Sequence, residues 1–133
     1  MTDSNEASKT ATEPDYNTLL RANLERVFNE RDDLKRNAAV QVLFSPEPTM
    51  YEPTGIVIGR SAISDVAGAL LKQFGPDFSF VPEGVAVGHH GLGYLKWRAG
   101  PANGPVVVSG VDAAEVSDGR IVRLWVLLDA PQG

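Results

Sequence analysis

The second half of this chain carries an apolar pattern with a period of two, and this pattern limits the fold more than any other feature. It runs from Phe78 to Leu128 and is interrupted by three turn sequences: His89-His90-Gly91, a loop with Asn103-Gly104, and Asp118-Gly119. Because side chains alternate between the faces of a strand, the pattern predicts strands at Phe78–Gly88, Leu92–Arg98, Pro105–Val116 and Arg120–Leu128. Short connections join antiparallel neighbours, so these strands form a meander. Pro82-Glu83-Gly84 predicts a bulge or bend in the first strand.

The first half of the chain has helical spacing instead. Three helices are expected: one after an N-cap at Asp15, a second from about Asp33, and a third from about Ser61 to Gly75-Pro76. Their inner faces are expected to carry, in turn, Tyr16, Leu19, Leu20, Leu24, Val27 and Phe28; Leu34, Ala38 and Val42; and Ile63, Val66, Ala67, Leu70, Leu71 and Phe74. Pro46 and Pro48 are expected to end the second helix, before short strands at Thr49–Glu52 and Ile56–Ile58. Helices followed by an antiparallel sheet predict an α+β domain with the helices on one sheet face.

Composition excludes several classes of protein. A length of 133 residues predicts one domain, residues 14–133, and the hydrophobic fraction of 43% is sufficient for an extensive core. A net charge of −5 argues against binding to nucleic acid, and the absence of cysteine excludes disulfides and thiolate metal sites. No apolar run is long enough for a membrane helix. The polar segment 1–13 lacks the apolar core of a signal peptide, so we expect a disordered tail and a cytoplasmic protein.

Asp112 stands out within the third predicted strand. It shares a face with Val108, Gly110 and Ala114, which are small and apolar. A carboxylate on such a face is costly unless it is paired or used. Two interpretations stay open: Asp112 takes part in chemistry, or it is a structural anchor held by backbone N–H groups or buried water.

The order of elements and several short motifs resemble the nuclear transport factor 2-like superfamily, and within it the SnoaL-like and ketosteroid isomerase-like branch. The resemblance covers residues 16–129. It is carried by four stretches: Phe28-Asn29-Glu30-Arg31-Asp32, Met50-Tyr51-Glu52-Pro53, Gly59-Arg60-Ser61-Ala62-Ile63, and the last hairpin from Gly110-Val111-Asp112 through Asp118-Gly119-Arg120-Ile121-Val122 to Trp125 and Asp129. The superfamily hosts many functions on one scaffold, so the resemblance defines the fold more firmly than the activity.

The resemblance implies a cone-shaped, curved sheet around the helices, with an apolar pocket that binds a small cyclic or polyketide-like molecule without a cofactor or metal. It places Glu52 where ketosteroid isomerases carry their general base, and Asp112 where they carry a carboxylic acid that an apolar site keeps neutral. The uncharged strand faces are expected to point inward, so the ligand-binding residues are expected to be Leu24, Met50, Phe80, Leu95, Trp97, Leu124 and Val126. Acid/base isomerase or cyclase chemistry is the catalytic hypothesis.

The resemblance also implies that homodimers form through the outer sheet face. That face is expected to show Tyr94, Lys96, Arg98, Val111, Glu115, Arg123, Trp125 and Leu127. The rival hypotheses are a non-catalytic ligand-binding protein and a protein-docking module that uses Trp125. Glu52 also has an alternative to its role as a base: it would then simply lie in solvent at the pocket mouth.

Two departures narrow the catalytic hypothesis. The oxyanion-hole tyrosine of ketosteroid isomerases corresponds to Leu24, which has no donor, and the base is a glutamate instead of an aspartate. Strict steroid isomerase activity is therefore not expected. His89 and His90 suggest a metal site only by adjacency. Neighbouring strand residues point to opposite faces, and both histidines lie at a turn beside Gly91, so we expect them to be surface residues.

Overall fold

A computed structural model describes residues 13–130 of the chain, so all but the last residue of the predicted tail, residues 1–13, lies outside the described part. The chain forms α2 (Tyr16–Asn23), a π-helical turn η1 (Leu24–Phe28), α3 (Asp33–Leu43), β1 (Phe44–Glu52), β2 (Gly55–Ile58), α4 (Arg60–Phe74), β3 (Phe78–His89), β4 (Leu92–Pro101), β5 (Val108–Ser117) and β6 (Arg120–Leu128). This confirms the predicted order of elements and the α+β class.

The strands form one curved, mixed sheet in the order β2-β1-β6-β5-β4-β3. The meander of β3 to β6 is antiparallel, and β3 has a register shift between Glu83 and Val87, as the Pro82-Glu83-Gly84 stretch predicts. β1 pairs with β6 in parallel, with Met50 opposite Leu124. The first and last strands of the chain are thus neighbours, and together they bring Glu52 beside the C-terminal half of the sheet.

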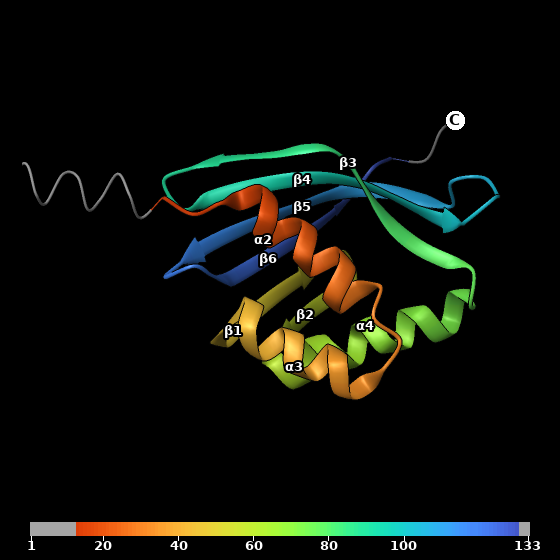
Figure 1. Ribbon diagram of the computed structural model, residues 1–133, viewed down its shortest axis with the longest axis horizontal. Helices are drawn as coiled ribbons and strands as arrows, with labels where there is room; N and C mark the ends of the chain where they lie inside the picture. The colour runs from red at the N-terminus through yellow and green to blue at the C-terminus, as the bar shows by residue number, and fades with distance from the viewer. Residues whose placement is uncertain (1–12, 131–133) are drawn as a thin grey trace, which may run out of the picture.

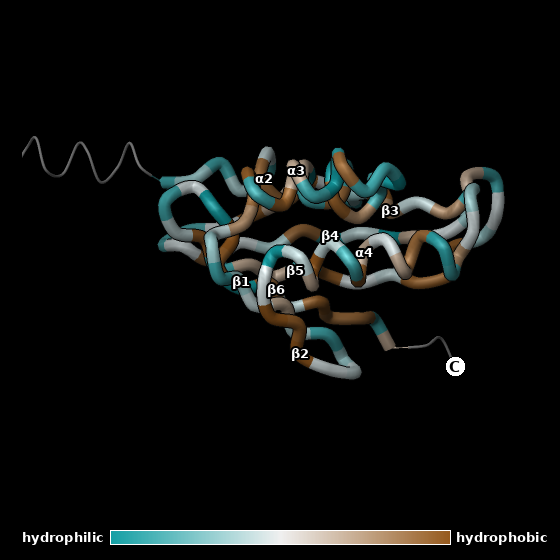
Figure 2. Tube along the Cα trace, turned by 90° about the horizontal axis from the view of Figure 1, so that it is seen from below, coloured by the Kyte–Doolittle hydropathy of each residue, from teal (hydrophilic) through white to brown (hydrophobic). Residues whose placement is uncertain are grey.

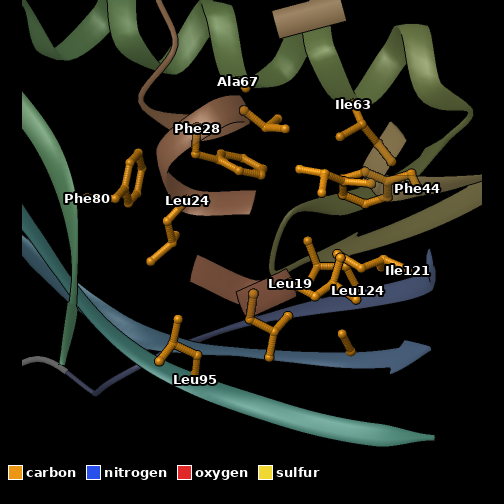
Figure 3. Close-up of a cluster of buried hydrophobic side chains, with 14 of the residues drawn as sticks. Leu19, Leu24, Phe28, Phe44, Ile63, Ala67, Phe80, Leu95, Ile121 and Leu124 are labelled. Atoms are coloured by element: carbon orange, nitrogen blue, oxygen red, sulfur yellow. The ribbon is translucent and has the colours of Figure 1, made fainter. Parts of the chain in front are cut away.

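The helices cover one face of this sheet (Figure 1). In the view from below, α2 and α3 lie along one side of the strands while β2 extends away from them (Figure 2). The core lies between the layers, where Leu20, Val27, Ile63, Leu95 and Leu124 are almost completely buried. Figure 3 shows side chains from η1, β3, β4 and β6 converging on this space below α4.

The connection from Phe28 to Asp32 holds three elements together. Asn29 makes two hydrogen bonds with the Phe80 backbone on β3, at 2.8 and 2.7 Å. Arg31 donates to the carbonyls of Leu71 and Gly75 and so satisfies the end of α4. Asp32 caps α3 through the Leu34 amide at 3.0 Å. The stretch is therefore a structural junction that fixes where η1 meets β3.

The second helix corrects the predicted inner face. Leu34 and Val42 are 80% and 56% exposed, and Ala38 is exposed as well. The buried face instead carries Arg36, Ala39, Val40 and Leu43. Arg36 can be buried because its guanidinium donates to the backbone carbonyl and hydroxyl of Ser64 and to the Glu30 carbonyl. The spacing of apolar residues alone therefore predicted the wrong buried face.

Several boundaries also differ from the prediction. β4 continues to Pro101 instead of ending at Arg98, and β5 begins at Val108 instead of Pro105. The first strand begins at Phe44 instead of Thr49, so Pro46 and Pro48 lie within β1 and do not end the preceding helix. The first helix does not run regularly to Phe28, because the Asn29 amide bonds to the Leu24 carbonyl at 2.8 Å and widens the last turn. Among residues 13–130, no helix has the length and apolar character needed to cross a membrane.

Candidate functional site

A cavity of about 170 Å³ opens between the helices and the inner face of the sheet. Its wall is almost entirely apolar and comes from η1, α4 and five strands or their ends. The lining residues are Leu24, Phe28, Glu52, Pro53, Leu70, Phe74, Phe78, Phe80, Trp97, Val108, Asp112, Val126 and Leu128. Within the described chain, Glu52 and Asp112 are the only ionisable residues of this wall. The family resemblance suggested this pair, and both members lie in the wall of a single cavity.

The cavity has a buried inner end and an accessible mouth. Asp112, Trp97 and Leu24 are at most 3% exposed, whereas Phe74 and Leu128 are 39% and 48% exposed. Glu52 is half-buried and precedes the exposed Pro53. We therefore place Asp112 at the inner end and Glu52 toward the mouth.

Asp112 reaches the cavity because of the register of the central strands. It lies opposite Leu95 on β4 and Val126 on β6, so its side chain points to the inner face with theirs. The Trp97 indole N–H donates to Asp112 Oδ1 at 2.9 Å. Within residues 13–130, this is the one hydrogen bond found to the Asp112 carboxyl group. Asp112 is thus not held by backbone N–H groups from the described chain, and Oδ2 remains available.

Gly110 makes room for this hydrogen bond. It pairs with Trp97 across β4 and β5, and a Cβ atom at Gly110 would lie 3.1 Å from the indole ring and 2.4 Å from the Leu127 carbonyl oxygen. Without a side chain at Gly110, the indole of Trp97 can lean across β5 toward Asp112, two residues along the strand. Phe80 then packs edge-on against Trp97, with ring centroids 5.3 Å apart.

The apolar surroundings change the protonation of both acids. Burial raises the pKa of Asp112 from 3.8 to about 7, against the opposing effect of the Trp97 hydrogen bond. Burial also raises the pKa of Glu52 above its usual 4.5. Asp112 is therefore divided between its neutral and charged forms near neutral pH. When it is neutral, Trp97 occupies Oδ1, so the proton belongs on Oδ2, the oxygen that is free to donate to a ligand.

The predicted site residues separate into two groups. Leu24, Phe80, Trp97 and Val126 line the cavity together with Glu52 and Asp112. Met50, Leu95 and Leu124 are fully buried in the core and are not part of the cavity wall. They lie beside the wall on the same inner face of the sheet, since Leu95 pairs with Asp112 and Met50 pairs with Leu124.

Seven lining residues were not among the predicted site residues: Phe28, Pro53, Leu70, Phe74, Phe78, Val108 and Leu128. Most of them are apolar positions that the helical and strand patterns had already assigned to inner faces. Periodicity shows which face is inward, but it does not distinguish a position that fills the core from one that borders an opening. Phe74 and Leu128 carry a usable signal, because each is the last apolar residue of its element, α4 or β6, and is partly exposed.

The two adjacent histidines are exposed at a turn beside Gly91, as expected, but the expectation that their side chains point to opposite faces was wrong. Their side chains do not point apart: the Nδ1 atoms lie 2.9 Å from each other, because His90 has a positive φ of 53° in the turn. Among residues 13–130, no group of three or more His, Asp or Glu side chains is arranged to hold a metal ion.

The three helices, the curved mixed sheet and the cavity between them define an α+β protein of the nuclear transport factor 2-like superfamily. The chain belongs to the SnoaL-like domain family, which it matches over residues 20–124. Among curated proteins, none matches the chain.

Solved structures agree with this placement. A candidate isomerase of the SnoaL-like family from Agrobacterium tumefaciens is 25% identical, with a TM-score of 0.77 over 85% of this chain and 96% of that chain. A candidate ketosteroid isomerase from Kribbella flavida is 14% identical, with a TM-score of 0.66 over 88% of this chain and 79% of that chain. A candidate polyketide cyclase from Sinorhizobium meliloti is 16% identical, with a TM-score of 0.63 over 82% of this chain and 93% of that chain. The last two are similar in fold alone.

Proposed function

We propose that this protein binds a small, mostly apolar organic molecule in the cavity and transfers a proton on it, with Glu52 as general base and Asp112 as hydrogen-bond donor. One observation carries the proposal: in the described wall of an apolar cavity, the only two ionisable residues are carboxyl groups whose pKa values are both raised by burial. The likeness to a candidate isomerase of the SnoaL-like family supports the same reaction class.

Glu52 and Asp112 have different roles because they differ in burial. Glu52 is half-buried near the mouth and ionises more easily than the enclosed Asp112, so it is the group that can accept a proton from a carbon next to a carbonyl. Neutral Asp112 donates from Oδ2 to the carbonyl oxygen and stabilises the negative charge that develops there. The proton moves from the substrate carbon to Glu52, and Glu52 can return it to another carbon of the enolate.

The cavity wall explains why Asp112 must act as the donor. By the family resemblance, Leu24 corresponds to the oxyanion-hole tyrosine of ketosteroid isomerases, and its side chain, which lines the cavity, has no polar atom. The indole N–H of Trp97 is already directed to Asp112 Oδ1. Among the lining side chains, Asp112 and Glu52 are thus the two groups left that can donate to a ligand.

The test is exchange of hydrogen for deuterium next to the carbonyl of small cyclic ketones, followed by NMR in D2O. We expect Glu52→Gln and Asp112→Leu each to slow the exchange by about 100-fold or more. Glu115→Gln on the outer face is the matched control and should exchange at the wild-type rate. Exchange at the uncatalysed rate in the wild type, with ketone bound, would instead establish the alternative, a non-catalytic ligand-binding protein.

A second proposal concerns the partner: two copies of the chain associate through their outer sheet faces. Register places one apolar row across all six strands: Ile56, Tyr51, Trp125, Ala113, Tyr94 and Val87. Its members include Ile56 and Tyr94, which are 65% and 43% exposed, and the stacked rings of Tyr51 and Trp125. The apolar colour along β2 in Figure 2 marks one end of this row.

The rim of this row favours a second copy over an unrelated partner. Arg123 and Glu115 pair at 2.6 Å on one side of the row, and Arg98 and Glu83 lie 3.5 Å apart on the other. Each face therefore presents charges of both signs around an apolar centre, which is an arrangement that can complement itself across a two-fold axis.

A further inference from the structure

We propose that the cavity accepts a neutral molecule with a single ring and one oxygen acceptor, which lies with its oxygen on Asp112 at the inner end and its ring against the aromatic wall. This inference rests on the proposed function, because it names the ligand class of the same site. It differs from what the fold resemblance suggests, since steroids and polyketides carry several fused rings.

Cavity size is the first argument. A volume of about 170 Å³ is close to that of an engineered protein cavity of roughly 150 Å³ that binds benzene. Sites for drug-sized molecules commonly span about 300–1,000 Å³. One six-membered ring with its substituent oxygen fills this cavity, and a second fused ring would have to project through the mouth beyond Phe74 and Leu128.

The shape of the wall is the second argument. Phe28, Phe78 and Trp97 each pack edge-on against Phe80, with ring centroids 5.3 to 5.9 Å apart. These rings fix one another, and Asn29 holds the Phe80 backbone in place from η1. The aromatic side of the cavity is therefore preorganised, and it cannot widen for a larger ligand without breaking several ring contacts.

Charge is the third argument. The described lining residues from η1, β1, α4, β3, β4, β5 and β6 include two acids, Glu52 and Asp112, and no base. A carboxylate ligand would meet two acids and no cation, so anions are excluded. A primary ammonium ligand would need acceptors for three N–H groups, whereas the inner end offers one free oxygen. A ketone or enone needs only one hydrogen bond, which its carbonyl oxygen accepts from Oδ2 of neutral Asp112.

The proposal is tested by equilibrium binding, which does not depend on catalysis. Trp125→Phe leaves Trp97 as the single tryptophan, and its fluorescence then reports on the inner end of the cavity. The probes are cyclohexenone, toluene, cyclohexylamine, benzoate and a four-ring steroid enone. We expect cyclohexenone to bind at least about tenfold more tightly than benzoate, cyclohexylamine or the steroid.

Two variants identify the hydrogen bond. Asp112→Leu should weaken cyclohexenone by about tenfold and leave toluene unchanged, because the ring contacts remain while the donor is lost. In the Trp125→Phe protein, which keeps Asp112, the affinity for cyclohexenone should fall by about tenfold as the pH rises from 6 to 8, because Asp112 loses its proton with a pKa of about 7. Asp112→Asn keeps a permanent donor and should abolish this pH dependence.

Different results would overturn the single-ring neutral ligand and the proposed proton transfer. Tightest binding by the four-ring enone, or affinity for cyclohexylamine that increases with pH, would overturn the single-ring neutral ligand while leaving proton transfer intact. Cyclohexenone binding that follows the expected pattern without any deuterium exchange would support the ligand class and reject catalysis.

Discussion

Replacing Asp112 by asparagine should remove a pH-dependent loss of stability. The unfolded chain releases the Asp112 proton near its ordinary pKa of 3.8, whereas the folded protein holds it up to a pKa of about 7. Between these values the folded state binds more protons than the unfolded state, so the free energy of unfolding falls as pH rises. The loss begins near pH 4 and is complete above the folded pKa, where a charged carboxylate is buried beside apolar groups.

The structure sets the magnitude of this loss. A difference of one in pKa corresponds to about 1.4 kcal/mol, so the interval from 3.8 to about 7 corresponds to at most about 4 kcal/mol. Asparagine has nearly the same shape, its carbonyl can accept the Trp97 N–H in place of Oδ1, and it does not titrate. The free energy of unfolding of D112N minus that of the wild type should therefore increase by up to about 4 kcal/mol between pH 4 and pH 8.

Urea denaturation followed by circular dichroism at several pH values measures both free energies. A hydrogen bond with Tyr16 lowers the pKa of Glu13, and hydrogen bonds with Thr18 lower the pKa of Asp15. These groups make the folded protein more stable as pH rises, which is opposite to the effect of Asp112. Both are present in D112N, so their contribution cancels in the difference. Glu52→Gln is the second reference and should show the same sign with a smaller change, because Glu52 is only half-buried. A difference between wild type and D112N that stays constant within about 1 kcal/mol from pH 4 to pH 8 would refute the burial of a titrating Asp112.

Three further changes test the rest of the structure. Trp97→Phe removes the hydrogen bond that lowers the pKa of Asp112. Deuterium exchange should slow at high pH as Asp112 loses its proton, and a pH profile of the exchange rate should show this decline at higher pH in the variant than in the wild type. Gly110→Ala places a Cβ atom 2.4 Å from the Leu127 carbonyl oxygen and should destabilise the fold by about 1–3 kcal/mol in urea denaturation; a neutral effect would contradict the close approach. Tyr94→Lys introduces a charge into the exposed apolar row and should convert dimers to monomers in light scattering, whereas a wild type that is already monomeric rejects the dimer.

The strands were predictable because their pattern depends on local alternation. The period of two placed Leu95 and Trp97 on the inner face of β4, and the structure confirms it. The bulge in β3 followed from Pro82 and Gly84 for the same reason, since Pro82 fixes its own φ and Gly84 can adopt the positive φ of 75° found there. Alternation was not sufficient in β5, where both faces carry mostly small residues, and the inward direction of Asp112 came from the family resemblance.

The errors arise where distant parts of the chain decide the outcome. The buried face of α3 includes Arg36, whose partner Ser64 is on α4, so the apolar spacing of Leu34 and Val42 was misleading. Parallel pairing of β1 with β6 has no local signature, and it determines that Glu52 lies on the same side of the sheet as Asp112. The size of the cavity was equally hidden, because aromatic residues have the same periodicity whether they fill a core or border an opening.

The hydrogen bond from Trp97 to Asp112 depends on how β4 and β5 are paired, which the apolar pattern of the sequence does not specify. The choice between structural anchor and chemical group depended on the hydrogen bonds of Asp112, which no sequence pattern specifies. Trp97 binds only one carboxyl oxygen, and it does so because Gly110 lies opposite the indole and leaves the surface of β5 open. A single N–H donor holds the side chain in position but offsets only part of the cost of burying a charge, so the pKa remains raised. The same contact therefore gives Asp112 a fixed orientation and a neutral form near pH 7, which are the two properties that a hydrogen-bond donor to a ketone requires.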